Sequence, residues 1–324
     1  MNMPVGGWIR ILVLALVAAA PVAAAAQAYP TKPIRIVVPF APGGASDVLA
    51  RLVGQKLSER LGQPVIVENK PGATTTLGAA EVAKAPADGY TLYLMPGTHA
   101  LVPSLVAKVP FHVANDFTMV AMLGTQPYMI FANPKQPFST FAEMLAYARA
   151  NPGQLSMGVS DAVTLVTAST LKSVAKIDIN VINYKGGGPQ NTDLLGNQIA
   201  TAVVTPNLMP QQRDGKLRSI AVTTPQRLSF LPDSPTIAES IPGSQFDIHT
   251  WYAVAGPANL PKPIVDRLHA EIAKLVADGD FRRRLDDLGV VRPSDTRPEA
   301  ATAAMRAYQE RMAKLIDAAG IKPE

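Results

Sequence analysis

A glycine-rich turn carries the first residues with evident chemistry. Residues 39–47 read PFAPGGASD and follow a β-branched run. The two glycines permit backbone conformations that other residues resist, and they let a ligand approach the main chain. A helix starting after them would present unpaired N–H groups and the positive end of its dipole, so the turn could bind a carboxylate or a phosphate. The alternative is a tight turn in which Ser46 or Asp47 caps the helix and Asp47 pairs with Arg51.

Two further glycine-rich turns could line the same site. Residues 70–76 read KPGATTT, where three consecutive hydroxyls at a helix start could act as caps or as anion donors. Residues 184–189 read YKGGGP and follow another strand-like run. This turn lacks the G-x-x-x-x-G-K-[ST] order of a phosphate loop, and the chain has no G-x-G-x-x-G, so nucleotide binding is not indicated. We therefore expect the three turns to form separate walls of one cleft.

A catalytic serine is the alternative chemistry. Ser160 lies in the sequence GVSDA, which approaches the G-x-S-x-G nucleophile elbow but has Ala162 in place of the second glycine. His249 is the one histidine that we can place near the cleft as a base. The other interpretation is that the hydroxyls of Ser160 and Thr164 cap a helix or bind a ligand. A secreted serine hydrolase using Ser160 is therefore kept as the alternative function.

Metal, thiol and nucleic-acid chemistry are disfavoured by composition. The chain has no cysteine, which excludes thiolate zinc sites, disulfides and cysteine nucleophiles. Its four histidines show no metal-binding spacing, so we expect neither a metal nor a cofactor. The net charge of +5 is spread along the chain, and the longest basic run, at 282–284, is typical of an exposed helix face. We expect no nucleic-acid partner.

The first 28 residues are typical of a secretory signal peptide. Arg10 precedes a run of about ten apolar residues, and small residues follow up to Ala28. Cleavage near Ala28 would start the mature chain at Tyr29. A membrane anchor is the alternative, but the run is shorter than the roughly 20 residues that span a bilayer. Export of a cysteine-free chain fits a periplasmic location.

The elements that must position these turns alternate between strands and helices. The sequence predicts strands and helices in turn, as in βαβ units with mostly parallel sheets. For a first lobe it predicts strands at 34–38, 65–67, 90–95 and 119–123 and helices at 45–61 and 76–85. A further strand-like run at 128–132 lies where the chain would cross into a second lobe, for which the sequence predicts strands at 155–159, 180–183, 200–205 and 219–222 and a helix at 140–150. A long alternating run at 246–255 would cross back, and helices at 263–277, 279–288 and 298–319 would pack on the first lobe.

This order predicts an α/β fold of two lobes. We expect lobe 1 to comprise residues 29–131 and 250–324, and lobe 2 to comprise residues 132–249. Open α/β sheets bind ligands at the carboxyl ends of their strands, so the site should be the cleft between the lobes. Hydrophobic residues make up 48% of the chain, which is enough for a large core.

Five ordered sequence blocks resemble the Bug family, the periplasmic substrate-binding proteins of tripartite tricarboxylate transporters. The blocks are VPFAPGGASD at 38–47, VENKPGA at 67–73, PADGYTL at 86–92, YKGGGP at 184–189 and GKLR at 215–218. The resemblance implies a two-lobed, type II-like "Venus flytrap" that closes on a small organic carboxylate, such as a di- or tricarboxylate, an aromatic acid or an acidic amino acid. It also implies a monomer with no catalytic residue, delivering its ligand to a two-component membrane permease.

The resemblance further implies a set of binding residues. The carboxylate receptor would be the turn Phe40, Ala41, Pro42, Gly43, Gly44, Ser46 and Asp47, with Gly43 and Gly44 offering main-chain contacts. Ala73, Thr74, Thr75, Thr98 and His99 would complete the wall of lobe 1. From lobe 2, the ligand would be covered by Ser160, Asp161, Thr164, Tyr184, Lys185, Gly186 and Thr205.

Three departures from the family pattern concern the far end of the ligand. The chain has Thr74 and Thr75 where the family usually has glycines, and residues 159–164 read VSDAVT in place of a glycine/serine-rich loop followed by His-Leu. An aspartate common in the second lobe is replaced near Thr205. The carboxylate end stays intact, whereas the identity of the ligand stays open.

Overall fold

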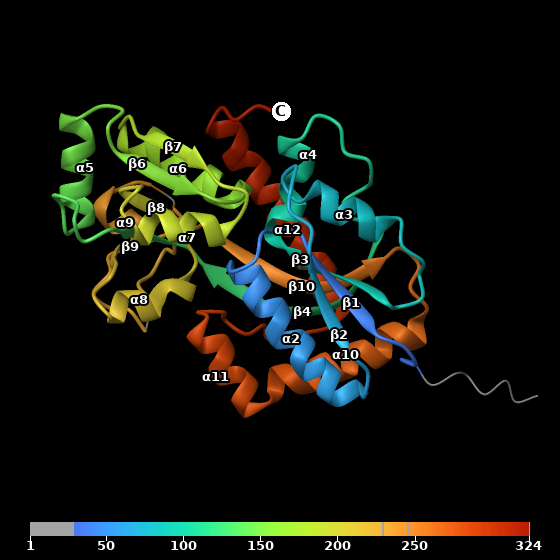
Figure 1. The fold of residues 1–324 in the computed structure, drawn as a ribbon. Coiled ribbons are helices and arrows are strands. Elements are labelled where there is room, and N and C mark those ends of the chain that lie inside the picture. The colour runs from blue at the N-terminus through green and yellow to red at the C-terminus, as the bar shows by residue number, and fades with distance from the viewer. Residues whose placement is uncertain (1–28, 229, 245, 324) are drawn as a thin grey trace, which may run out of the picture. The chain divides into compact units, whose positions relative to one another are not determined.

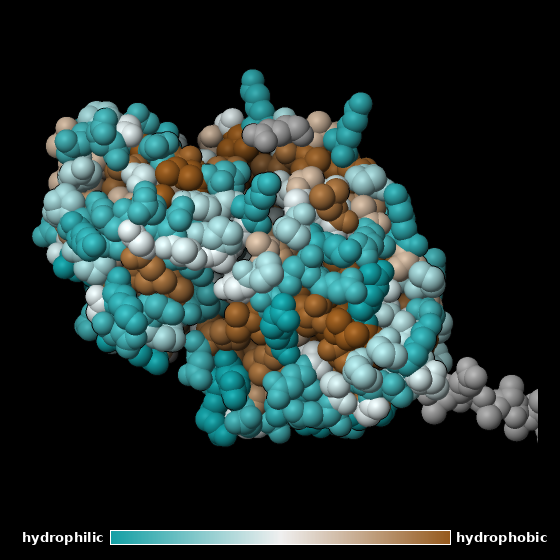
Figure 2. Space-filling view, in the orientation of Figure 1, coloured by the Kyte–Doolittle hydropathy of each residue, from teal (hydrophilic) through white to brown (hydrophobic). Residues whose placement is uncertain are grey.

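The computed structural model describes residues 29–228, 230–244 and 246–323. The chain forms two units, Met1–Thr31 and Lys32–Glu324, and the fold described below is that of the second. The expected signal peptide and its cleavage site lie outside the described residues. Among the described residues, none of the helices has the length and apolar character needed to cross a bilayer. On the face shown in Figure 2, hydrophobic residues form separate patches among hydrophilic ones.

Two five-stranded sheets organise the second unit (Figure 1). The sheet of lobe 1 has the spatial order β2 (Val65–Asn69), β1 (Ile34–Val38), β3 (Thr91–Pro96), β10 (His249–Pro257) and β4 (Phe117–Pro127). The sheet of lobe 2 has the order β7 (Asn180–Asn183), β6 (Ser156–Val159), β8 (Thr201–Val204), β5 (Met129–Ala132) and β9 (Arg218–Val222). We use lobe 1 and lobe 2 for the parts built on these two sheets.

Both sheets are mixed, so the expectation of mostly parallel sheets is wrong. Strand β1 pairs in parallel with β2 and β3, and β6 pairs in parallel with β7 and β8. Strands β10 and β5 are antiparallel to both of their neighbours. Strand β5 begins just after the chain enters lobe 2, and β10 begins where the chain returns to lobe 1. Each therefore runs in the direction opposite to that of the strands beside it.

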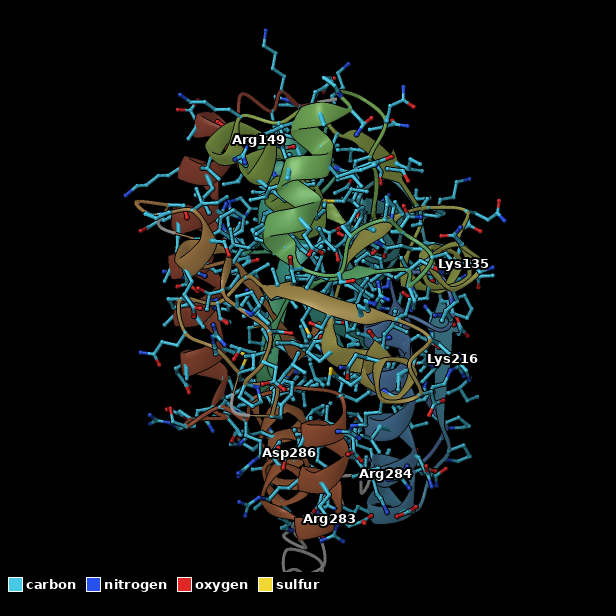
Figure 3. All side chains as sticks on the ribbon, turned by 90° about the vertical axis from the view of Figure 1, so that its left-hand side faces the viewer. Lys135, Arg149, Lys216, Arg283, Arg284 and Asp286 are labelled. Carbon is cyan, nitrogen blue, oxygen red and sulfur yellow. The ribbon has the colours of Figure 1, made fainter. Side chains whose placement is uncertain are left out.

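The helices of lobe 1 flank its sheet. They are α2 (Ala45–Leu61), α3 (Thr76–Ala83), η1 (Gly97–Leu101), α4 (Val102–Leu105), α10 (Lys262–Ala277), α11 (Gly279–Asp287) and α12 (Pro298–Ala318). Helices α2 and α10 contact each other, whereas α3 contacts β3 and β10 and α12 contacts β4. In Figure 3, Arg283 and Arg284 lie on α11, and all three arginines of the run 282–284 are exposed.

Strand β5 of lobe 2 buries both faces. Along β5, Met129 and Phe131 belong to one apolar cluster, whereas Ile130 and Ala132 belong to another, as the two-residue period of a strand requires. The covering helices are α5 (Phe141–Ala150), α6 (Ala162–Ala175), α7 (Gly187–Leu195), η2 (Pro206–Leu208), α8 (Met209–Arg213) and α9 (Ile237–Ser240). Helix α6 also contacts α12 and η1, so the two lobes share one core cluster.

The chain crosses between the sheets at Tyr128, which separates β4 from β5. The expected boundary after residue 131 therefore falls inside β5, and the return at residues 249–250 falls at the start of β10. We retain the division into 29–131 with 250–324 and 132–249 as a proposal. Strand β4 extends well beyond the expected 119–123, because its polar residues Thr125 and Gln126 pair with β10.

A single buried hydroxyl joins the two crossings. Thr223 is fully buried, its Oγ1 accepts the N–H of Tyr128 at 3.1 Å, and it lies 2.6 Å from the carbonyl oxygen of Ile248, to which it donates. Its main chain completes the link, since the N–H of Thr223 bonds to the Tyr128 carbonyl and the N–H of Ile248 bonds to the Thr223 carbonyl. Thr223 thus links the connecting segments at the point where the pairing of β4 with β10 ends.

We expect Thr223→Val to lower the free energy of unfolding by about 1–3 kcal/mol, because it leaves buried partners of the hydroxyl unsatisfied. Urea denaturation measures this change. In the control Thr302→Val, the lost hydroxyl bonds only to the Pro298 carbonyl within α12, so we expect a change within about 0.5 kcal/mol. Equal losses in the two variants would contradict a special role of Thr223.

Candidate functional site

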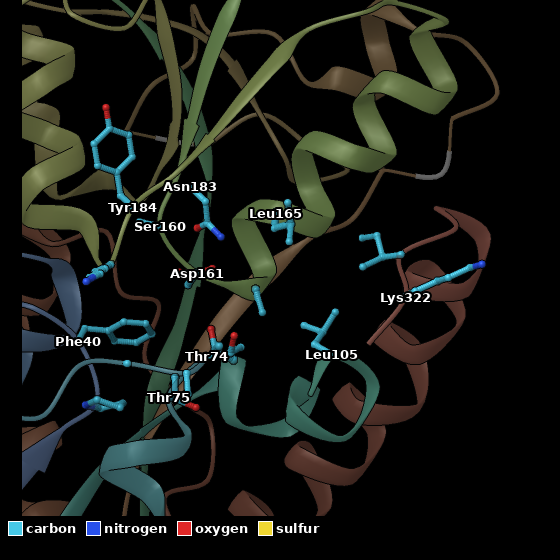
Figure 4. A pocket seen from close by; sticks show the side chains of 17 residues that line it. Phe40, Thr74, Thr75, Leu105, Ser160, Asp161, Leu165, Asn183, Tyr184 and Lys322 are labelled. Carbon is cyan, nitrogen blue, oxygen red and sulfur yellow. The ribbon is translucent and has the colours of Figure 1, made fainter. Parts of the chain in front are cut away.

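Two adjoining cavities lie where the loops of the two lobes face each other. The larger has a volume of about 360 Å³ and the smaller about 40 Å³. Phe40, Ser160 and Asp161 line both, so the cavities share a wall. In Figure 4, Asp161 lies near the start of α6, with Asn183 above it and Thr74 and Thr75 below. Loops that follow parallel strands supply these walls, as expected for α/β sheets.

Most of the expected binding residues line these cavities. The larger cavity is lined by Phe40, Ala73, Thr74, Thr75, Thr98, Ser160, Asp161, Tyr184 and Lys185. The smaller is lined by Phe40, Gly44, Ser46, Ser160, Asp161, Thr164 and Thr205. The remaining expected residues line neither: Ala41, Pro42, Gly43, Asp47, His99 and Gly186. The structure therefore brings segments from both lobes to one place.

The smaller cavity receives three helix N-termini. Ala45 and Ser46 open α2, Gly187 opens α7, and Asp161 and Thr164 belong to the first turn of α6. The first N–H groups of a helix have no partner within the helix, and its N-terminus carries a partial positive charge. At α6 the carboxylate of Asp161 already caps the helix, whereas the starts of α2 and α7 have no side-chain cap. These two ends, one from each lobe, make the cavity a favourable place for an anion.

Gly43 does not offer its N–H to the cavity, which corrects the expected role of this glycine. Its N–H donates to Oδ2 of Asp47 at 3.0 Å, so the main-chain donors on this side are those at the start of α2. Three more of the expected residues contact the other lobe and do not line a cavity: Ala41, Pro42 and Gly186. A Cβ on Gly186 would lie 3.0 Å from the Ala41 nitrogen, and one on Gly188 would lie 2.2 Å from the Pro42 oxygen. These residues form the direct contact between the lobes beside the cavities.

Asp47 anchors the first turn from beneath instead of lining the cavity. Its buried carboxylate accepts hydrogen bonds from the Gly43 N–H, from Asn69 Nδ2 at 2.9 Å and from Arg51 Nε at 3.1 Å. Burial acts to raise the pKa of Asp47, but these hydrogen bonds and the charge of Arg51 outweigh it and hold the pKa below its usual value. The pairing with Arg51 considered from the sequence is therefore present, and it supports the turn.

The second turn has an unusual backbone. Ala73, Thr74 and Thr75 have φ angles of 45°, 49° and 73°, a left-handed region that favours glycine. Such conformations persist only where the surroundings impose them, and they cluster at functional sites. The Thr75 side chain is buried, and its Oγ1 has no hydrogen-bond partner among the described residues. Two threonines thus adopt a backbone conformation that glycine would adopt at lower cost.

Asp161 and Thr164 cap helix α6. Asp161 Oδ1 accepts the Thr164 N–H at 2.8 Å, while Thr164 Oγ1 accepts the N–H groups of Ser160 and Asp161. Asp161 Oδ2 accepts a hydrogen bond from the Tyr128 hydroxyl at 3.2 Å. Burial raises the pKa of the Asp161 carboxyl above its usual value, with the helix N–H groups and Tyr128 opposing that effect.

Tyr184 contributes its ring to the wall, while its hydroxyl is engaged elsewhere. Its OH donates to Oδ2 of Asp193 at 2.7 Å, and Figure 4 shows the ring pointing away from Phe40 and Asp161. Burial and the neighbouring carboxylate of Asp193 raise the pKa of Tyr184 to about 12. We therefore expect the Tyr184 hydroxyl to contact Asp193 and not a ligand.

His99 is a core residue, which corrects its expected place in the binding wall. It is fully buried, its Nε2 lies 3.0 Å from the Val113 carbonyl oxygen, and its ring packs between Phe111 and Phe117. Burial lowers the pKa of His99 to about 4, against a smaller opposing effect of the bond to Val113. The sequence neighbours Thr98 and His99 thus separate, because consecutive residues in η1 point in different directions.

We expect His99 to make unfolding pH-dependent. An unfolded histidine binds a proton below about pH 6.5, whereas folded His99 stays neutral down to about pH 4. Its contribution to stability is therefore complete above about pH 6.5 and falls by about 3 kcal/mol as the pH drops to 4. We expect His99→Gln to remove that part of the pH dependence in denaturation curves recorded from pH 7 to pH 4. An unchanged dependence in this variant would contradict the assignment.

The alternative with a serine nucleophile lacks its base. No histidine among the described residues lines either cavity with Ser160. His249 lies elsewhere, with Nδ1 3.3 Å from Asp247 Oδ1 and Arg311 Nη2 3.3 Å from its ring nitrogens. Within the described residues, no group of three or more histidine, aspartate and glutamate side chains could hold a metal ion.

Several lining residues escaped the sequence analysis. Tyr128 and Tyr252 line the smaller cavity from the two crossing segments, together with Gln190 and Asn191 from α7. At the other end of the larger cavity are Leu105, Leu165, Ile321 and Lys322. The crossing strands could have been used to find the two tyrosines, because such strands must pass beside the cleft. The segment that follows α12 carries no comparable signal in its sequence.

Comparison with known proteins assigns the family. The family described as "Tripartite tricarboxylate transporter family receptor" matches residues 49–321. The structure of the periplasmic binding protein BugD is 31% identical in sequence, covers 91% of this chain and 100% of its own, and gives a TM-score of 0.87.

Two similar structures are of Rhodopseudomonas palustris proteins with a named ligand. Rpa4515 with adipate is 30% identical, with 91% of this chain and 100% of its own covered and a TM-score of 0.86. MatC with bound malate is 29% identical, with 89% and 100% covered and a TM-score of 0.83. The two-lobed α/β fold is thus that of periplasmic binding proteins of the "Venus flytrap" type, and the chain belongs to the Bug family, the receptors of tripartite tricarboxylate transporters.

Proposed function

We propose that this protein is an extracytoplasmic receptor that captures a small organic carboxylate between its lobes. The observation that carries the proposal is the meeting of two helix N-termini without a side-chain cap, from α2 in lobe 1 and from α7 in lobe 2, at one small cavity. A carboxylate bound there would contact both lobes only when the lobes are together. Its binding energy would therefore shift the population toward the closed arrangement.

The larger cavity would hold the rest of the ligand. Figure 4 shows Leu105, Leu165 and Lys322 on the side away from Phe40, so that end combines apolar side chains with one basic residue. Its size fits a small di- or tricarboxylate, an aromatic acid or an acidic amino acid. Adipate and malate, the ligands named for the two R. palustris proteins, fall in this range. The expected binding residues that line the cavities remain our proposed contacts.

We further propose that the protein is exported to the periplasm as a monomer without a cofactor, and that it delivers its ligand to a two-component membrane permease. Family membership and the N-terminal sequence support these proposals. We also propose that it catalyses no reaction. The relatives with known structures are binding proteins, and the base that Ser160 would need does not line the cavities among the described residues.

A ligand panel tests the proposed function. Succinate, adipate, malate, citrate, benzoate and aspartate are first screened by thermal shift, since a ligand that binds only the folded state raises the melting temperature. Isothermal titration then gives affinities, which we expect near the micromolar level, about −8 kcal/mol. Mass spectrometry after incubation should recover the ligand unchanged. A hydrolysis product that disappears in Ser160→Ala would favour the hydrolase, and absence of binding across the panel would refute the receptor.

A further inference from the structure

The smaller cavity contains a carboxylate without a positive partner. Asp161 lines both cavities, and its oxygens accept hydrogen bonds from Thr164 and Tyr128. Among the residues that the structure describes, no lysine, arginine or histidine forms a salt bridge with it. A carboxylate removed from water is costly unless a counter-charge or hydrogen-bond donors compensate it. A second carboxylate placed against it would add repulsion.

The same cavity contains an acceptor that has no hydrogen-bond donor among the described residues. Gln190 is fully buried, and its Nε2 donates to the Val203 carbonyl at 3.1 Å, which fixes the orientation of the amide. Its Oε1 then has no hydrogen-bond partner among the described residues. Leaving a buried acceptor unpaired costs about 1–3 kcal/mol. Gln190 and Asp161 thus both present acceptors to a cavity whose other walls carry helix N–H groups.

This combination of acceptors and donors suits a particular kind of ligand. The N–H groups at the starts of α2 and α7 suit a carboxylate. The acceptors Asp161 and Gln190 suit a group that donates several hydrogen bonds and carries a positive charge. An ammonium group has three donors and no acceptor, and it would compensate the charge of Asp161. A hydroxyl group would satisfy one acceptor and leave the charge in place.

Building on the proposed function, we propose that Asp161, with Gln190, selects carboxylates that bear a protonated amine near the carboxylate. Asp161 is then the specificity-determining residue of this receptor. The amine would donate to Asp161 Oδ2 and Gln190 Oε1, while the adjacent carboxylate accepts from the helix N-termini. A diacid of equal length without the amine would leave Gln190 Oε1 without a donor and the charge of Asp161 without a counter-charge.

The test compares compounds that differ only in the amine. Titration calorimetry at pH 7.5 on the purified protein uses two matched sets: succinate, L-malate and L-aspartate, and adipate with L-2-aminoadipate. In at least one of the two sets, we expect the amine-bearing acid to bind at least tenfold more tightly than its parent diacid. The affinity for malate should lie between those for succinate and aspartate. Asp161→Asn should weaken binding of the amine-bearing acid at least thirtyfold and tighten binding of the parent diacid, because it removes the charge that opposes the diacid. Asparagine caps a helix as well as aspartate does, so α6 should persist.

Two further variants keep the result interpretable. Asp278→Asn replaces the exposed cap of α11, and it should change neither affinity. Gln190→Met removes the second acceptor at similar size, and it should also weaken the amine selectively. Equal binding of amine and parent diacid by the wild-type protein, or equal weakening of both by Asp161→Asn, would overturn the proposal while leaving the receptor function standing. Absence of binding by every compound would instead refute the receptor function, and this proposal with it.

Discussion

Gly188→Ala should weaken carboxylate binding at least a hundredfold while leaving the protein folded. A Cβ at this position would lie 2.2 Å from the main-chain oxygen of Pro42, which belongs to the other lobe. Gly188 lies in the first turn of α7 and has no left-handed φ, so alanine suits its own helix. The clash therefore opposes contact between the lobes and not the folding of either one. A hundredfold loss corresponds to about 2.7 kcal/mol of closure energy.

A neighbouring glycine supplies the matched control. A Cβ on Gly187 would lie 3.4 Å from the Gly44 Cα, an ordinary contact distance. We expect Gly187→Ala to change affinity by less than about fivefold, since only a small adjustment is needed. Calorimetry with a panel acid that binds the wild-type protein measures both variants, and thermal denaturation verifies folding. An affinity of Gly188→Ala for the acid within about threefold of the wild-type value would contradict the prediction. It would mean that Gly188 and Pro42 are not in contact in the ligand-bound protein.

Asp47→Ala should cost about 2–4 kcal/mol of unfolding free energy and weaken ligand binding as well. The substitution removes the buried carboxylate that accepts from Gly43, Arg51 and Asn69, so three charge-assisted hydrogen bonds of the turn are lost. Asn69 also donates to the Phe40 carbonyl, so the lining residue Phe40 would lose part of its support. Urea denaturation gives the stability change, and titration with a panel acid gives the affinity.

The cost of Asp47→Ala should depend on pH in a definite direction. Because the pKa of folded Asp47 lies below its usual value, the stabilisation is complete above the unfolded pKa of about 4. It is lost as the pH falls through the lower folded pKa, so wild type and variant should converge in strong acid. The exposed pair of Lys262 and Asp266 has the same four-residue spacing, and Asp266→Ala should cost at most about 0.5 kcal/mol. Similar costs for the two variants would contradict an anchoring role of Asp47.

Local patterns predicted the elements and the turns well. The expected helix at 45–61 is α2, and the expected strands at 34–38 and 180–183 are β1 and β7. Apolar periodicity, glycine and capping residues determine such elements over short distances, so they can be recognised one segment at a time. The turns after β1, β2, β6 and β7 line the cavities for a general reason: parallel strands bring their carboxyl ends to one edge of the sheet.

The departures arose where distant segments meet. Strand β4 continues to Pro127 because β10 pairs with it, and that pairing depends on residues more than a hundred positions away. His99 is turned into an aromatic cluster with Phe111 and Phe117, although its neighbour Thr98 lines the larger cavity. Gly43 gives its N–H to Asp47 and not to the cavity. The residue types of His99 and Gly43 were compatible with ligand binding. Their neighbours in the folded protein gave His99 a place in the core and Gly43 a role in supporting the turn.

The sequence by itself determined the class of the fold and the loops that could receive an anion, because both depend on local composition and spacing. The export signal, which rests on the same kind of pattern, stays a prediction. Only the tertiary structure decided that the Gly43 N–H bonds to Asp47, that Gly188 packs against Pro42, and that one small cavity holds both the carboxylate of Asp161 and the unsatisfied acceptor of Gln190. The physical reason is that hydrogen-bond satisfaction and steric contact are properties of pairs of atoms. Such pairs exist only after the chain has brought its two lobes together.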